Sequence, residues 1–248
     1  MSGTGIPDSL YGTQPPPVPE PAPGLLDQVV GVFTEPVALF KRLAATPVWG
    51  GALALLTAFN LAVAVLWARK VDVDALLRPV LERNPRLNPE DLERILAIQA
   101  RFTLPLAILG GLVGLTLFCL LMAWLYWLVG KATAEHHPPA FRQAFAATAV
   151  GALVGLPKAI LLGIVCTLRN IGGTKPDALS PTALGFYVAP DGIRLHAFFN
   201  TLDLFTFAGL LMVFLAARHA MRLKVAGAVL CTAIAAVVML GLPVLFAS

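Results

Sequence analysis

The sequence is poor in charge, and this scarcity decides the class of protein. Of its 248 residues, 13% are charged and 58% are hydrophobic, whereas about a quarter of the residues in a soluble domain are charged. The mean hydropathy of +0.79 comes from long apolar runs without the periodicity of a strand or of a half-exposed helix. Such runs form helices that are apolar all round. We therefore exclude an ordinary soluble domain and predict an all-α polytopic membrane protein.

The sequence also lacks cysteine pairs and a basic nucleic-acid face. Its three cysteines, Cys119, Cys166 and Cys231, lie singly inside apolar runs, which excludes a disulfide framework and a zinc site and indicates small packing residues. The net charge of +4 resides in cations beside apolar runs, with no aromatic platform among them. Nucleic acid is therefore not an expected partner, and these cations are better explained by orientation in a membrane.

The signatures of an enzyme are missing as well. The chain has no HExxH motif, no GxSxG motif with partners and no paired acids within its apolar runs, so we expect no catalytic residues and no cofactor. Glu135, His136 and His137 form a cluster of metal-ligand types. Adjacent side chains cannot easily converge on one ion, and we interpret this cluster as a polar loop, not a metal site.

What the sequence has is five long apolar segments. They predict a five-helix transmembrane bundle over residues 48–248, with spans at about 48–67, 104–129, 144–168, 198–217 and 225–246. The first thirty residues lack a signal-peptide pattern, so we expect the first span to act as an uncleaved anchor.

Two further segments precede the first span. Residues 1–24 are rich in proline and glycine and are expected to be disordered or polyproline II. Residues 25–47 are amphipathic and broken at Pro36. They predict short helices that either lie on the membrane surface or pack against the bundle, and both alternatives stay open.

Two local motifs concern the second span. Asn88 followed by Pro89 and two acids predicts a helix start within the polar segment 68–101. This segment mixes both charges, which is typical of a solvated helical hairpin. Gly110 and Gly114 form a GxxxG pair, a spacing that favours close packing of membrane helices.

Charge between the last two spans predicts the orientation. Arg218, Arg222 and Lys224 lie in this turn, and no basic residue follows them. Because loops rich in lysine and arginine stay in the cytoplasm, this turn and the N-terminus are expected in the cytoplasm and the C-terminus outside. The arginine-rich segment 68–101 would then lie outside, against the same rule.

Four polar residues within the apolar runs are candidate functional or structural residues: Asn60, Lys158, Asn200 and Asp203. Asn60 is expected to form a hydrogen bond across helices. Lys158, next to Pro157, costs several kcal/mol unless it is paired or reaches water.

Two interpretations of Asp203 compete. It could pair with Lys158, which would require a kink at Pro157 or a shorter third span. Alternatively, Asn200 caps a helix and Asp203, three residues later, faces the positive helix end. We favour the capping interpretation because its geometry needs no distortion.

Three motifs resemble the YIP family, the Ypt/Rab-interacting-protein-like membrane proteins, in its bacterial form. They are Val32-Phe33-Thr34-Glu35-Pro36, Phe141-Arg142-Gln143-Ala144-Phe145 and Asn200-Thr201-Leu202-Asp203-Leu204-Phe205. The resemblance implies a five-span bundle with a cytoplasmic N-terminus, and no catalytic residues. In eukaryotic relatives it implies vesicle trafficking with small GTPases. This chain lacks their aspartate-leucine-tyrosine-glycine motif and has a proline-rich tail instead, so a small GTPase is a doubtful partner.

The prediction is thus a non-enzymatic membrane organiser or adaptor in a bacterial inner membrane. The alternative is a small-solute or ion transporter or channel that uses Lys158 and Asp203. The expected partner is the lipid bilayer, together with a second copy of the chain or other membrane proteins.

Overall fold

A computed structural model describes residues 21–83, 87–133, 138–188, 192–245 and 247. These residues form helices and short helical turns joined by loops, with one isolated bridge between Ala183 and Asp203. Residues 1–20 of the predicted tail and the Glu135–His137 cluster lie outside the described residues.

Four of the helical segments are long and apolar enough to cross a membrane. They are α3 (Gly50–Lys70), the continuous α5–α6 segment (Pro89–Thr133), the α7–α8 segment (Phe141–Leu168) and the α11–α12 segment (Val225–Leu245). The 21 residues of α3 extend about 31 Å at 1.5 Å per residue, which matches a hydrocarbon thickness of about 30 Å. The all-α membrane bundle predicted from the apolar runs is therefore confirmed.

Three of these segments contain a local change of helix type. A π-helical turn at Gly110–Gly114 joins α5 (Pro89–Leu109) to α6 (Leu115–Thr133). A 3-10 turn at Ala152–Gly155 joins α7 (Phe141–Gly151) to α8 (Leu156–Leu168), and a second π turn joins α11 (Val225–Ala236) to α12 (Leu242–Leu245). The predicted helix start at Asn88 is confirmed, because its side-chain oxygen accepts the Asp91 amide at 2.7 Å.

The predicted fourth span at 198–217 is not one helix. It divides into α9 (Ile193–Thr201) and α10 (Leu204–His219), with Leu202 and Asp203 outside both. The 16 residues of α10 extend about 24 Å, less than the hydrocarbon thickness. The backbone is non-helical here because the Leu202 carbonyl accepts the Leu184 amide at 2.9 Å instead of an amide of its own helix.

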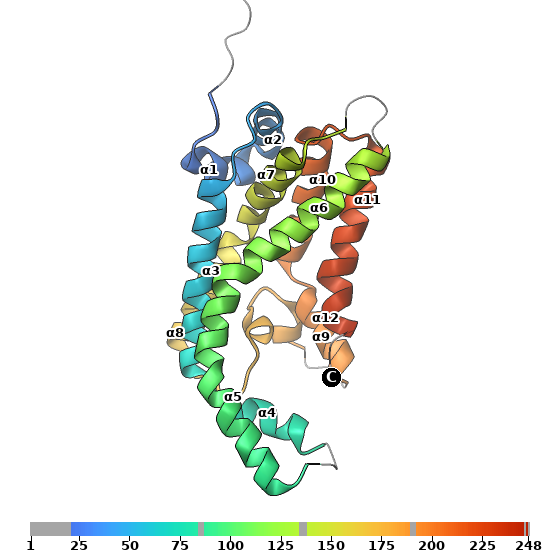
Figure 1. The fold of residues 1–248 in the computed structure, drawn as a ribbon. Helices are drawn as coiled ribbons and strands as arrows, with labels where there is room; N and C mark the ends of the chain where they lie inside the picture. The colour runs from blue at the N-terminus through green and yellow to red at the C-terminus, as the bar shows by residue number, and fades with distance from the viewer. Residues whose placement is uncertain (1–20, 84–86, 134–137, 189–191, 246, 248) are drawn as a thin grey trace, which may run out of the picture.

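The bundle has two different ends (Figure 1). Helices α1 (Leu25–Thr34) and α2 (Pro36–Ala45) lie at one end, beside the start of α7 and the α10–α11 turn. Helix α4 (Val73–Leu81) and the start of α5 project at the opposite end. At the first end, Gln143 Nε2 donates to the Ala44 carbonyl at 2.8 Å and so joins α7 to α2.

Both alternatives for the amphipathic segment find support in this arrangement. Leu39, Phe40 and Leu43 of α2 are buried in a core cluster with α3, α7 and α10, so α2 packs against the bundle. Helix α1 instead leaves the side chains of Leu26 and Phe33 exposed, as expected of a helix at a membrane surface. The three cysteines are free and buried, as small packing residues should be.

The glycine pair of the second span does not pack as the GxxxG motif predicts. A Cβ atom on Gly110 or Gly114 would meet nothing within 4 Å. Gly111, which lies between them, packs against α3 instead: a Cβ atom there would lie 2.9 Å from Leu61 Cα. The π turn changes which residues face α3, and sequence spacing on a regular α-helix could not anticipate this.

The α4–α5 hairpin is held by an exposed network around Arg78. Its guanidinium lies 2.6 Å from Asp74 Oδ1 and 2.9 Å from Glu93 Oε1. The hydrogen bond from Arg78 holds the pKa of the Asp74 carboxyl below its ordinary value of 3.8. A lowered pKa means that this contact stabilises the hairpin at neutral pH and is lost as the pH falls through the folded-state pKa.

We therefore expect α4 to open more readily below about pH 4 than at neutral pH. The protection factors of the α4 amides, which correct for the slower intrinsic exchange in acid, should fall by roughly two- to threefold, because exposed ion pairs contribute little. The Asp74→Asn variant should show the lower protection factors already at pH 7. An acid-induced change of equal size in that variant would contradict this assignment.

Candidate functional site: the Lys158–Asp203 centre

The two charged residues predicted within the spans meet in the structure. Lys158 Nζ lies 3.1 Å from Asp203 Oδ2, and the Asp203 side chain is fully buried, whereas the Lys158 side chain is 30% exposed. The two residues come from α8 and from the start of α10. Because an unpaired charge at this depth is costly, this contact accounts for the presence of both.

Lys158 owes its position to the start of α8. The 3-10 turn at Ala152–Gly155 ends one residue before Leu156, and Pro157 lies in the first turn of α8. Proline is tolerated there because its missing amide would have no helical partner. Pro157 thus starts a helix after a change of helix type, and this change places Lys158 against Asp203.

Asp203 is itself the N-cap of α10. Its Oδ1 atom accepts the Phe205 amide at 2.8 Å. Its Oδ2 atom accepts the Ser180 hydroxyl at 2.7 Å and the Thr182 hydroxyl at 3.0 Å, in addition to contacting Lys158. One carboxylate therefore satisfies a helix end, two hydroxyls and an ammonium group.

The loop before α9 brings the two hydroxyls to this carboxylate. Ala183 and Asp203 form an antiparallel bridge, and the Leu184 amide donates to the Leu202 carbonyl. Next to this bridge, Gly185 packs directly on Asn200, where a Cβ would lie 2.0 Å from Asn200 Oδ1. The absence of a side chain at Gly185 thus allows the loop to lie against α9.

Asp203 does cap a helix, but the capping interpretation assigned the wrong residue as N-cap. Asn200 is not an N-cap: it lies inside α9, and Asp203 occupies the cap position of the next helix. The ion pair, the competing interpretation, forms at the same time. Both interactions coexist because the carboxylate has two oxygens and lies between helices.

The other two predicted residues play no part in the ion pair. Asn200 is buried, and its Oδ1 atom has no hydrogen-bond partner among the described residues. Asn60 is exposed on α3, and its Nδ2 atom donates to the Leu56 carbonyl of its own helix at 2.9 Å. The expected hydrogen bond from Asn60 to another helix is therefore replaced by one within α3.

Sequence reasoning missed Ser180 and Thr182. They lie on either side of Pro181 in a loop whose sequence predicts exposed turns, yet Ser180 is fully buried. The available signal was a pair of hydroxyls two residues apart, which an extended chain directs to one side. Ser180 Oγ and Thr182 Oγ1 are 3.0 Å apart, and both bond to the same carboxylate oxygen.

This centre joins three parts of the chain: α8, the 180–184 loop and the start of α10. Hydrogen bonds to a charged group are stronger than those between neutral groups, and in a buried setting they fix the relative positions of the elements that bear them. The arrangement can therefore lock a broken helix into the bundle. In the part of the chain that the structure describes, no group of three or more metal-ligand side chains lies together.

Fold and site together define a polytopic all-α membrane protein with a buried ion pair at a helix break. Comparison with protein families then assigns it more closely: the Yip1 domain matches residues 30–246, so the chain belongs to the Yip1 family. This match confirms the family resemblance of the three sequence motifs. Neither the comparison with curated proteins nor the comparison with solved structures finds a match.

Proposed function

We propose that this Yip1-family protein is a non-enzymatic organiser or adaptor within a bacterial inner membrane. The observation that carries the proposal is the completeness of the Lys158–Asp203 centre. The carboxylate is fully buried, and the Lys158 ammonium, two hydroxyls and one amide of the protein surround it. A centre built in this way holds helices together, which is what a scaffold in the membrane requires.

The proposal includes five crossings of the membrane. Helices α9 and α10 together supply the additional one, because α10 lies inside the bundle against α2, α7 and α11. The cations of the α10–α11 turn support a cytoplasmic position for this turn and for the N-terminus, with the C-terminus outside. The proposed partners are the bilayer and, through the unpacked glycines Gly110 and Gly114, a helix of a second copy or of another membrane protein.

One observation favours a second candidate, a transporter or channel for ions or small solutes. The chain is non-helical at Leu202 and Asp203, and an ion pair lies at this break. Broken helices with charged groups within the membrane are typical of transport sites. In this alternative, Lys158 and Asp203 separate to admit an ion.

Flux measurements distinguish the two candidates. We expect vesicles containing the purified full-length protein to show no more ion or solute flux than empty vesicles, because the protein's own groups occupy the centre. The Lys158→Ala variant should give the same result, and Lys131→Ala, which removes a cation outside the centre, is the matched control. A saturable flux that Lys158→Ala abolishes and Lys131→Ala retains would establish the transporter instead.

A further inference from the structure

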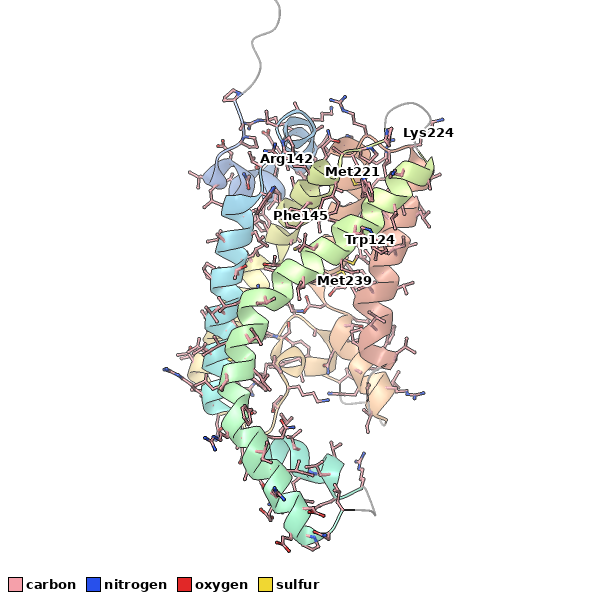
Figure 2. The ribbon with its side chains drawn as sticks, viewed as in Figure 1. Trp124, Arg142, Phe145, Met221, Lys224 and Met239 are labelled. Atoms are coloured by element: carbon pink, nitrogen blue, oxygen red, sulfur yellow. The ribbon has the colours of Figure 1, made fainter. Side chains whose placement is uncertain are left out.

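A group of cations covers the end of the bundle that carries α1 and α2. We call this group the basic face. It comprises residues from α2, the end of α6, the start of α7 and the α10–α11 turn: Lys41, Arg42, Lys131, Arg142, Arg218, Arg222 and Lys224. Figure 2 shows Arg142 and Lys224 toward this same end of the bundle. Among the described residues of α1, α2 and these neighbouring segments, only Asp27 and Glu35 are acidic, so positive charge is in excess.

Contacts between the segments hold the basic face together. Gln143, next to Arg142, bonds to the Ala44 carbonyl of α2. Arg218 Nη1 donates to the Leu223 carbonyl and closes the α10–α11 turn. The Pro139 ring and the Leu223 side chain both lie against Gly130 at the end of α6. These cations therefore share one surface instead of lying on separate loops.

The opposite end of the bundle has a different charge arrangement. There Arg78 contacts both Asp74 and Glu93, and arginines alternate with acids along α4 and the start of α5. Such mixed charges neutralise one another locally. At the basic face Arg42 lies 3.8 Å from Asp27, but cations outnumber acids, and this excess favours a negatively charged partner.

Aromatic residues place the basic face at the level of lipid headgroups. Trp127 packs edge-on against Phe141, Phe141 stacks on Phe145, and Phe145 packs edge-on against Trp49. The Lys131 ammonium lies 4.7 Å from the centre of the Trp127 ring. Tryptophan and neighbouring cations at a helix end are typical of the membrane interface.

The exposed edge of α1 supplies an apolar contact at the same end. Leu26, Val30 and Phe33 are 74%, 49% and 49% exposed, and their spacing places them on one side of the helix. A helix that exposes such an edge beside cations binds in the plane of a membrane surface, with its apolar side chains between lipids.

One cation of the basic face, Arg222, has an unusual backbone conformation. Its φ of 56° is the one positive value for a non-glycine residue among those described. Glycine is the usual residue at such a position after a helix, and a side chain there is strained. The chain thus places an arginine where glycine would be easier to accommodate.

We propose that the basic face binds the phosphate groups of anionic phospholipids while the exposed edge of α1 inserts between their chains. This partner is favoured by the excess of positive charge, by the aromatic residues typical of the headgroup region, and by the exposed apolar edge of α1. The inference rests on the membrane bundle and is independent of whether the protein is an organiser or a transporter.

The test compares two phospholipids that differ in headgroup charge. Binding of labelled phosphatidylglycerol and phosphatidylcholine to the full-length protein is measured in neutral detergent. We expect clear preference for phosphatidylglycerol, and a decrease of about fivefold in its affinity for each cation removed. The triple variant Lys131→Gln/Arg142→Gln/Arg222→Gln should therefore lose most of the preference. Added salt should weaken binding to the unaltered protein.

Two further triple variants serve as controls. Arg83→Gln/Arg94→Gln/Arg101→Gln removes the same charge from exposed positions after α4 and along α5, outside the basic face. This variant should keep the preference. Lys131→Arg/Arg142→Lys/Arg222→Lys keeps the charge and should also keep it. Equal losses in both glutamine triples would overturn the proposal, because net charge alone would then explain binding. Competition by inorganic phosphate beyond that of chloride at matched ionic strength would also overturn it, since the site would then bind free anions.

Discussion

The Asp203→Ala variant is expected to unfold far more easily than the unaltered protein. The substitution removes the N-cap of α10 and leaves the Lys158 ammonium, Ser180 and Thr182 without their shared acceptor. Breaking a buried ion pair by removing one partner costs about 3–5 kcal/mol, and the lost cap adds about 1 kcal/mol. The measurement is the free energy of unfolding in mixed micelles of a neutral detergent and dodecyl sulfate.

Substitutions at the same centre separate the ion pair from the cap. Asp203→Asn should lose less stability than Asp203→Ala by about 1 kcal/mol, because an amide oxygen can still accept the Phe205 amide. Lys158→Met should also lose less, since the carboxylate keeps three donors. The double variant Lys158→Met/Asp203→Ala should lose less stability than the sum of the two single-variant losses, by about 0.5–3 kcal/mol. Strictly additive losses would show that the pair contributes nothing to stability.

The long helices could be predicted from sequence because lipid makes their signal strong. A run of about 20 apolar residues has to satisfy its backbone internally, so a helix follows directly. Helices α3, α7–α8 and α11–α12 lie where the apolar runs predicted spans. The start of α5 was also predictable, because the signal at Asn88 and Pro89 is local.

The helix break at Leu202 and Asp203 could not be predicted in the same way. Its cause lies in the loop at Ala183 and Leu184, which pairs with these residues across the intervening α9. Asn200 and Asp203 lower the hydropathy at the break, but apolar residues continue the run on both sides. Nothing in the segment itself shows that its backbone bonds to a distant loop.

The sequence disfavours a Lys158–Asp203 contact, because the predicted spans place the two residues at different depths and their Cβ atoms lean towards opposite sides. In the structure, Lys158 lies in the first turn of α8, and Asp203 lies before α10 with an extended backbone. The direction of an N-cap side chain follows other rules than that of a helical one, so the geometric objection does not apply.

Gly185→Ala is expected to have the second large effect, and a purely steric one. The added Cβ would lie 2.0 Å from Asn200 Oδ1 and 2.9 Å from the Asn200 backbone nitrogen. The amide side chain can rotate, but the backbone of α9 cannot move without disturbing Leu202 and its bond to Leu184. We expect a loss of about 1–3 kcal/mol from overpacking, measured by the same unfolding experiment.

The clash should also reach the ion pair, because Ser180 and Thr182 lie in the same loop as Gly185. If the loop is displaced, the Asp203 carboxylate loses two of its donors, and a subsequent Asp203→Ala substitution should cost less than it does alone. Gly155→Ala is the matched control, since a Cβ there meets nothing within 4 Å. A second substitution, Asn200→Ala, should restore part of the stability of Gly185→Ala by removing the closer of the two contacts. No rescue, together with an undiminished effect of Asp203→Ala, would mean that Gly185 acts apart from the ion-pair centre.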